Sequence, residues 1–171
     1  MLLRRPICVA VILALPLAAC SKKDASAPYN VAEVSLEQVS ADLKAGNTTS
    51  VAATKAYIER IKAYDAPLHS VILVAPDAER QAAASDARRK AGKALGPLDG
   101  VPVLLKDNID AVGMATTAGS YALAANKPAQ DSEVAKRLKA AGAVILGKAN
   151  LSQWAAWRAT TAFNGSTVGG G

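Results

Sequence analysis

Hydrophobic residues recur along the chain with two spacings, one typical of helices and the other of buried strands. Apolar residues three or four positions apart predict helices over residues 36–45, 50–65, 76–92 and 131–141. Unbroken apolar runs predict strands over residues 70–74, 101–105 and 143–147. A helix-containing connection joins the last two runs, so they are expected to form a right-handed parallel pair. The pattern predicts an α/β fold with helices packed on a mixed, largely parallel sheet.

Local signals mark where several of these elements begin and end. SLEQ at residues 35–38 has the form of a capping box, and Gly46 follows the last apolar position of the first helix. Pro76 suits the first position of the alanine-rich third helix, whose basic residues are expected to be exposed. Residues 150–157 are expected to form a short helix with Trp154 and Trp157 on one face, either in the core or lining a substrate site.

The run GVPVLLKDN at residues 100–108 is the main candidate for chemistry. An apolar strand ends directly in Lys106, and Asp107 and Asn108 favour a turn. Side chains at the carboxyl end of a parallel strand commonly build sites in α/β folds. Lys106 could simply place its ammonium in water. If Lys106 were enclosed, loss of solvation would lower its pKa and make it a base.

The first residues have the features of an export signal. Arg4 and Arg5 precede an apolar stretch at residues 7–17 that is too short to span a bilayer easily. LAAC at residues 17–20 resembles a bacterial lipobox, so residues 1–19 are expected to be a signal peptide and Cys20 a lipidation site. An ordinary signal peptide with an incidental Cys20 is the alternative. Residues 20–32 are polar and small, as in a flexible tether.

Composition excludes several other chemistries. The formal net charge is +6, but basic residues do not form a stripe interleaved with aromatics, so nucleic acid is not expected as a partner. The two cysteines are Cys8, in the predicted signal, and Cys20, so none remains for a disulfide, metal or thiol nucleophile. His69 is the sole histidine, and no nucleophile-elbow motif accompanies it.

Two blocks resemble the amidase signature family. GPLDGVPVLLKDN at residues 96–108 resembles its lysine segment, and AGAVILGKANLSQW at residues 141–154 resembles its next block. The resemblance extends from about residue 34 to the end and implies the amino-terminal part of a peptide-amidase-like, lipoprotein-type enzyme. It implies the amidase signature fold, Lys106 as a catalytic residue, and a Ser–cis-Ser–Lys triad that hydrolyses small-molecule or peptide amides. The family requires no metal or organic cofactor.

The chain departs from the family's pattern at its end. The family's two serines lie in a glycine-rich Gly-Ser-Ser-Gly block, whereas NGSTVGGG at residues 164–171 resembles the segment before that block. Residues 33–171 are therefore expected to be a truncated amidase domain, inactive alone, on an exported lipoprotein at the outer membrane or periplasmic face. The alternatives are a non-catalytic surface lipoprotein and a tRNA-amidotransferase-type protein, and the export signal argues against the latter.

Overall fold

Helices and strands alternate as the hydrophobic pattern predicts. The structure is a computed structural model and describes residues 28–155 and 167–168. The helices are α1 (Leu36–Ala45), α2 (Ser50–Tyr64), α3 (Ala78–Lys90) and α4 (Glu133–Ala140), with 3-10 turns η1 (Tyr121–Leu123) and η2 (Gln153–Ala155). The strands are β1 (Val71–Val74), β2 (Pro102–Lys106) and β3 (Val144–Ala149). The predicted α/β class is confirmed.

The strands form one mixed sheet with β3 in the middle, in the order β1-β3-β2. β3 pairs parallel with β2 and antiparallel with β1. In the parallel pair, Leu105 lies opposite Lys148 and Lys106 lies opposite Ala149. The carboxyl ends of β2 and β3 therefore meet at the same end of the sheet.

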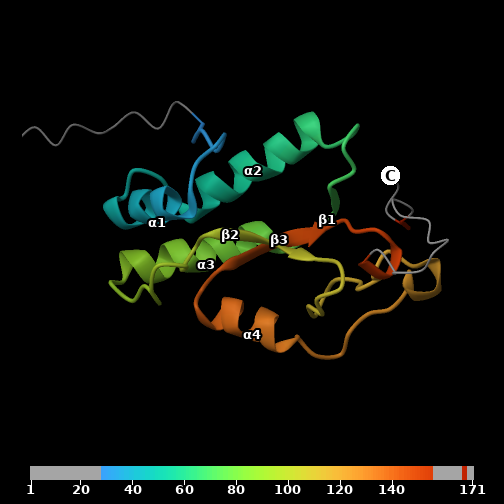
Figure 1. Cartoon of the computed structure of the whole chain (residues 1–171). Helices are drawn as coiled ribbons and strands as arrows, with labels where there is room; N and C mark the ends of the chain where they lie inside the picture. Colours follow the sequence, from blue (N-terminus) through green and yellow to red (C-terminus); the bar gives the residue numbers. More distant parts are fainter. Residues whose placement is uncertain (1–27, 156–166, 169–171) are drawn as a thin grey trace, which may run out of the picture.

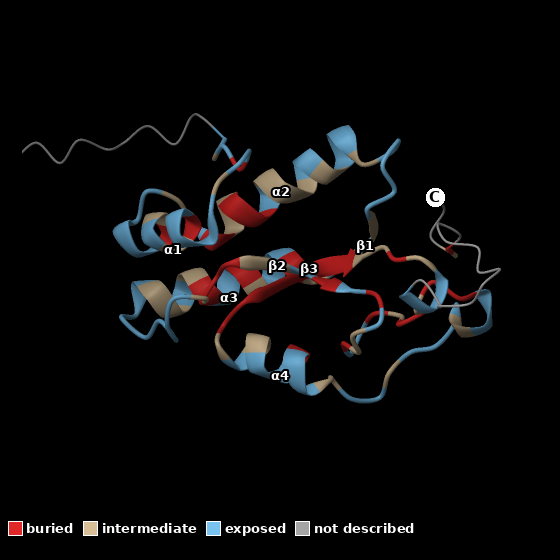
Figure 2. Ribbon diagram, in the orientation of Figure 1, coloured by how far each residue is buried: buried red, intermediate tan, exposed pale blue. Residues whose placement is uncertain are grey.

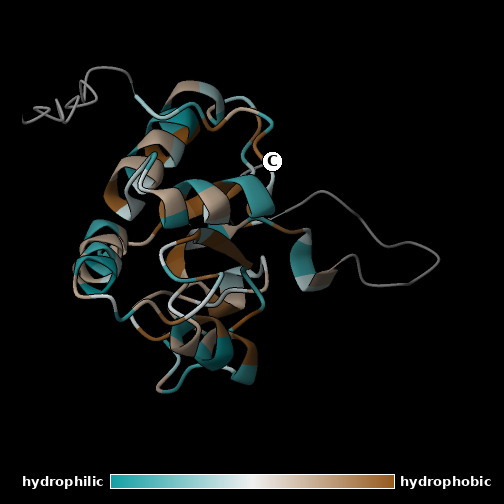
Figure 3. Cartoon of the chain, turned by 90° about the vertical axis from the view of Figure 1, so that its left-hand side faces the viewer, coloured by the Kyte–Doolittle hydropathy of each residue, from teal (hydrophilic) through white to brown (hydrophobic). Residues whose placement is uncertain are grey.

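Helices cover the sheet from two sides. α2 and α4 lie on opposite sides of it in Figure 1, and α3 contacts both α2 and β3. Figure 2 shows β3 buried, whereas much of each helix faces solvent. The hydropathy colours in Figure 3 show the same division, with hydrophobic strands between more hydrophilic helices. The main core contains Ala75, Ala78, Ala82, Leu105, Ala111, Met114, Ala135, Val144, Ile145 and Leu146.

β1 approaches β3 most closely at a glycine. A Cβ atom added to Gly147 would collide with the carbonyl group of Leu73, so this position of the sheet excludes a side chain. Beyond the end of β1, the amide of Ile145 donates instead to Gln81 Oε1 at 2.9 Å. A side chain of α3 thus satisfies a backbone group that the short strand leaves unpaired.

The first helix begins and ends as predicted, but the third begins later. Ser35 Oγ accepts a hydrogen bond from the amide of Gln38 at 3.2 Å, and Gly46 ends α1 with a φ of 73°. α3 begins at Ala78, two residues after Pro76, because a turn with a hydrogen bond from Ala78 N to Ala75 O comes first.

The helix predicted over residues 150–157 is wrong for its first residues. The amide of Asn150 donates to Ser70 O at 2.8 Å, its side chain donates to His69 O at 2.7 Å, and these bonds extend the strand pairing instead. Only the 3-10 turn η2 follows, and its Trp154 has a φ of 53° and is 48% exposed. Trp157 lies outside the described residues.

The described residues begin at Pro28, so they include the end of the tether predicted at residues 20–32. Tyr29 Oη donates to Asp42 Oδ2 at 2.8 Å, and Val31 is buried. Tyr29 packs against Val39 and Leu43 of α1, so these residues are part of the packed fold. Residues 1–27, which include the predicted signal peptide and Cys20, lie outside the described residues. Over residues 28–155 and 167–168, helices long and apolar enough to cross a bilayer are absent.

Candidate active site

Lys106 lies where the sequence predicts it, at the carboxyl end of β2. Its side chain is exposed, and it makes no ion pair or side-chain hydrogen bond with the other residues that the structure describes. Its carbonyl accepts a hydrogen bond from the amide of Ile109 at 2.9 Å, which closes a turn. The strand end therefore presents a free primary amine to solvent.

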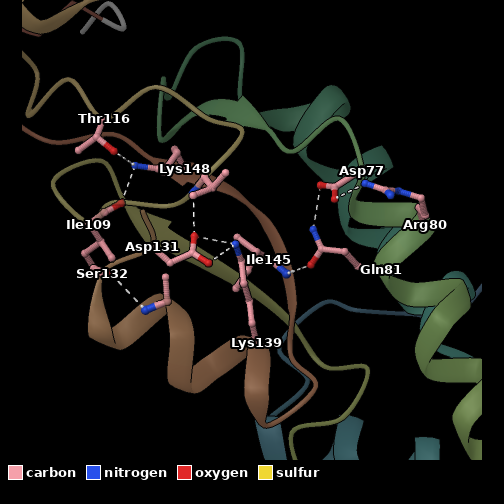
Figure 4. Close-up of polar contacts among 12 residues, drawn as sticks. Asp77, Arg80, Gln81, Ile109, Thr116, Asp131, Ser132, Lys139, Ile145 and Lys148 are labelled. Carbon is pink, nitrogen blue, oxygen red and sulfur yellow. Dashed lines mark hydrogen bonds and ion pairs between the residues drawn. The ribbon is translucent and has the colours of Figure 1, made fainter. Parts of the chain in front are cut away.

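A second lysine, Lys148, lies in the neighbouring strand and is fully buried. Its Nζ donates to the carbonyl of Ile109 at 2.8 Å and to Thr116 Oγ1 at 3.0 Å, as Figure 4 shows. It also lies 3.3 Å from Asp107 Oδ1, and both side chains of this ion pair are inaccessible to solvent. Burial lowers the pKa of Lys148, and the negative charge of Asp107 opposes that shift.

Asp107 joins Lys148 to the loop that follows β2. Its Oδ2 accepts hydrogen bonds from the amide of Thr117 at 3.2 Å and from the Thr117 hydroxyl. Its backbone amide donates to Ala149 O at 3.0 Å, and its carbonyl accepts from Ala118 N at 3.1 Å. The residue after Lys106 is therefore bonded both to β3 and to the loop.

The same loop contacts the segment that follows β3. The amide of Trp154 donates to Ala118 O at 2.9 Å, and the amide of Val168 donates to Gly119 O at 3.0 Å. Gly119 has a φ of 71°, and a Cβ atom there would lie 2.9 Å from Leu151 O. A side chain at this position would push the two segments apart, so glycine is required for the close approach.

A second ion pair, between Arg88 and the buried carboxylate of Asp99, corrects the prediction that the basic residues of α3 are simply exposed. Asp99 is fully buried and accepts from Arg88 Nη2 at 2.6 Å and from the amide of Leu95 at 2.9 Å, while Arg89 donates to its carbonyl. Burial raises the pKa of Asp99, but the hydrogen bonds from Arg88 and Leu95 outweigh burial and hold the pKa below its ordinary value. This pair fixes the turn before β2 onto α3.

A cleft that contains the basic side chains of Arg80, Arg88 and Lys139 lies away from Lys106. It has a volume of about 600 Å³ and is lined by residues of α3 and the start of β3. Its cations are already paired, since Arg80 contacts Asp77 and Lys139 contacts Asp131 at 2.7 Å, both visible in Figure 4. Groups of three or more His, Cys, Asp or Glu residues that could hold a metal are absent from the described part of the chain.

Sequence reasoning found Lys106 but missed Lys148 and Asp107 as a pair. Lys106 and Lys148 both lie at or just after the end of an apolar run, and this pattern was the only sequence signal that could have drawn attention to Lys148. The pairing itself joins residues 41 positions apart, so local pattern could not reveal it. Lys106 is an amine that solvent reaches, whereas Lys148 is enclosed and holds its neighbours through hydrogen bonds.

Comparisons with known proteins place the chain in a family. The profile of the family described as Amidase matches residues 52–168. The chain is 45% identical over 124 residues to a glutamyl-tRNA(Gln) amidotransferase subunit of Thermobifida fusca, which is 72% of this chain and 25% of that protein. It is also similar to the X-ray structure of peptide amidase from Stenotrophomonas maltophilia, with a TM-score of 0.77 and 45% identity over 82% of this chain and 29% of that one.

A bacterial aryl acylamidase described as an amidase signature enzyme shares 25% identity and a TM-score of 0.67, covering 73% of this chain and 26% of that one. The mixed α/β fold with the lysine-bearing strand in its sheet is thus a part of an amidase fold. The chain belongs to the amidase signature family. It spans about a quarter of the length of the curated relatives it matches.

Proposed function

We propose that this chain forms the lysine-bearing part of an amidase that hydrolyses carboxylic or peptide amides at the cell envelope. The observation that carries the proposal is the location of Lys106. It is an exposed amine at the carboxyl end of β2, without an ion-pair partner among the residues that the structure describes, and it lies within the segment that resembles the family's lysine block. The match of the Amidase profile to residues 52–168 supports the same reaction class.

The proposed mechanism gives Lys106 the role of base. Once enclosed, its amine would lose solvation and become neutral near physiological pH. It would then take a proton, through a bridging serine, from a second serine whose oxygen attacks the amide carbonyl carbon. Backbone amides would stabilise the oxyanion, at about 3 kcal/mol per donor. Collapse releases ammonia or an amine, and water hydrolyses the acyl-enzyme to a carboxylic acid.

Both serines would have to come from outside residues 1–171. Adjacent serines flanked by glycines do not occur in the sequence, and Ser166 lies in the segment that resembles the stretch before that block. The 171-residue chain alone is therefore expected to be inactive. Reading the gene beyond codon 171 tests this directly: an in-frame serine block supports an enzyme, and unrelated sequence after a stop codon supports a non-catalytic lipoprotein.

The catalytic test uses protein expressed from the whole gene. Replacing Lys106 by Ala should lower kcat for a peptide carboxamide by at least about 100-fold, because a general base is lost. Lys127→Ala is the matched control, since Lys127 is also exposed, and it should retain the parent rate. Parent-like hydrolysis by Lys106→Ala, or activity of residues 1–171 alone, would contradict the proposal.

A glutamyl-tRNA(Gln) amidotransferase activity is a second candidate because the subunit of that enzyme is 45% identical to this chain over the matched residues. Ammonia release from glutamine by the whole protein, without hydrolysis of peptide amides, would favour it. The predicted export signal instead favours an enzyme of the envelope.

We also propose that Cys20 carries a lipid that anchors the protein to a membrane. The supporting observation is the small-small-Cys sequence directly after an apolar run. Incorporation of labelled palmitate into the parent but not into Cys20→Ala, together with release of the variant from the membrane fraction, tests the anchor.

A further inference from the structure

One buried ammonium group holds both ends of the turn that follows Lys106. Lys148 Nζ lies 3.3 Å from Asp107 Oδ1 and donates to the carbonyl of Ile109 at 2.8 Å. The amide of Ile109 in turn donates to the carbonyl of Lys106 at 2.9 Å. Lys106 is therefore the first residue of a four-residue turn whose second and fourth residues are both bound by Lys148.

Asp107 transmits this constraint to the backbone of Lys106. One oxygen of its carboxylate accepts a hydrogen bond from Lys148, and the other accepts from Thr117. Its amide and carbonyl are also engaged, with Ala149 and Ala118. A rotation of the peptide between Lys106 and Asp107 would break several of these bonds together, so the direction in which β2 ends is fixed.

Packing alone does not call for a charged pair at this place. A buried ion pair can often be replaced by apolar residues of similar volume without loss of stability. Hydrogen bonds from an ammonium, however, have preferred lengths and directions that apolar contacts lack. The pair between Lys148 and Asp107 therefore fixes the backbone conformation at the end of β2.

We propose that Lys148 is a positioning residue for Lys106, acting through Asp107 and Ile109 to hold the turn at residues 106–109 in one conformation. Lys148 does not touch substrate in this role, because its side chain is fully buried. The consequence for catalysis rests on the proposed function of Lys106. The rigid turn itself does not depend on that function, and it can be measured separately.

The first experiment measures the turn in the 171-residue protein by amide hydrogen exchange. Lys148→Met keeps an unbranched side chain one atom shorter and removes the charge. We expect the amides of Ile109 and Ala118 to exchange at least about tenfold faster in this variant. Without the bonds from Lys148, opening of the turn costs less free energy. Lys139→Met is the matched control, since Lys139 also pairs with an aspartate, Asp131. Parent-like exchange at both amides in Lys148→Met would overturn the proposal.

The second experiment separates positioning from stability in the protein expressed from the whole gene. In the double variant Asp107→Asn/Lys148→Met no buried charge is left unpaired, so the urea midpoint should return towards that of the parent. If the pair positions Lys106, kcat should stay about 100-fold low in the double variant, with KM changed little. A double variant that recovers kcat together with stability would show that the pair is merely structural.

The two proposals fail differently. If Lys106→Ala is as active as the parent, the proposed function is wrong, and the exchange data still decide whether Lys148 fixes the turn. If Lys106→Ala is inactive while Lys148→Met keeps the parent kcat at a temperature where it is folded, only the positioning role is wrong.

Discussion

The two neighbouring strands β2 and β3 each carry a lysine near the carboxyl end, and the two side chains have opposite environments. Lys106 is exposed at the last position of β2, whereas Lys148 is completely buried one position earlier on β3. In the sheet they are offset by a single residue, because Leu105 and not Lys106 lies opposite Lys148. Side chains of successive residues point to opposite faces of a strand. The one-residue offset therefore decides which amine is enclosed.

The difference shows that a buried lysine in this fold requires a dedicated set of oxygen partners. Lys148 has a carboxylate, a hydroxyl and a backbone carbonyl within 3.3 Å. Removing two charges from water costs several kcal/mol for each ion, and only close partners offset that cost. Lys106 has none of these partners among the described residues and remains in solvent. The exposed amine of Lys106 and the enclosed amine of Lys148 thus differ in the oxygen partners that surround them.

The largest expected contrast is in chemical reactivity. Under a brief pulse of an acetylating reagent, Lys106 should react as an ordinary surface amine, whereas Lys148 should react at least about 1000-fold more slowly, because it is reached only in the rare unfolded molecules. Mass spectrometry of the proteolytic peptides gives both rates. In concentrated urea the two rates should become similar, and rapid acetylation of Lys148 in the folded protein would contradict its burial.

A large contrast is also expected in stability. Lys148→Met leaves the carboxylate of Asp107 buried without a counter-charge, so the free energy of unfolding should fall by about 3–5 kcal/mol. Lys106→Met removes no ion pair or side-chain hydrogen bond with the described residues and should change the free energy of unfolding by no more than about 0.5 kcal/mol. Urea titrations followed by circular dichroism measure both. If both variants lost the same free energy of unfolding, the ion pair between Lys148 and Asp107 would contribute no more to stability than the exposed Lys106 does.

A smaller loss of stability is expected from substitutions at Leu104 of β2 and Gly147 of β3, which lie opposite each other. Gly147→Ala places a methyl group against the carbonyl of Leu73 and should destabilise the protein by about 1–3 kcal/mol, as overpacking does. Leu104 is 37% exposed, so Leu104→Ala should have the smaller effect. Thermal unfolding measured side by side ranks the two. The reverse order would show that β1 can move away from β3 freely.

The smallest expected effect is a dependence of stability on pH. The pKa of Lys148 is lowered by burial, so the folded protein releases this proton more readily than the unfolded chain does. The contribution of Lys148 to stability is therefore least favourable below its folded pKa. It should improve as the pH rises towards the ordinary lysine value of about 10.4.

The difference in free energy of unfolding between the parent and Lys148→Met isolates this dependence. Tyr29, whose pKa is raised to about 12 by burial and by Asp42, acts in the opposite sense at high pH and contributes equally to both proteins. A difference that stays constant from neutral pH to about pH 10 would contradict the direction of the Lys148 shift.

Local signals in the sequence predict much of the fold because they act over a few residues. The cap at Ser35, the glycine at Gly46 and the apolar runs of β2 and β3 all operate within one element, and the structure agrees with each. Lys106 at the end of its strand follows from the same kind of pattern.

Features that depend on distant partners could not be predicted. Arg88 looks like part of an exposed charged face until Asp99 folds beneath it, and Lys148 looks like a polar end to an apolar run until Asp107 is brought against it. The helix expected at residues 150–157 fails for the same reason, because Asn150 finds partners at His69 and Ser70. In each case a partner outside the element overrides the local preference.

The middle strand of the sheet, β3, is also the last of the three strands in the sequence. During synthesis on the ribosome, β1 and β2 emerge first, and among the strands that the structure describes their partner β3 is complete only when residues up to Ala149 have been made. Their apolar edges remain open for that whole interval, and open edges invite association between nascent chains. A chain arrested before Val144 would therefore carry β1 and β2 without β3, the described strand that joins them.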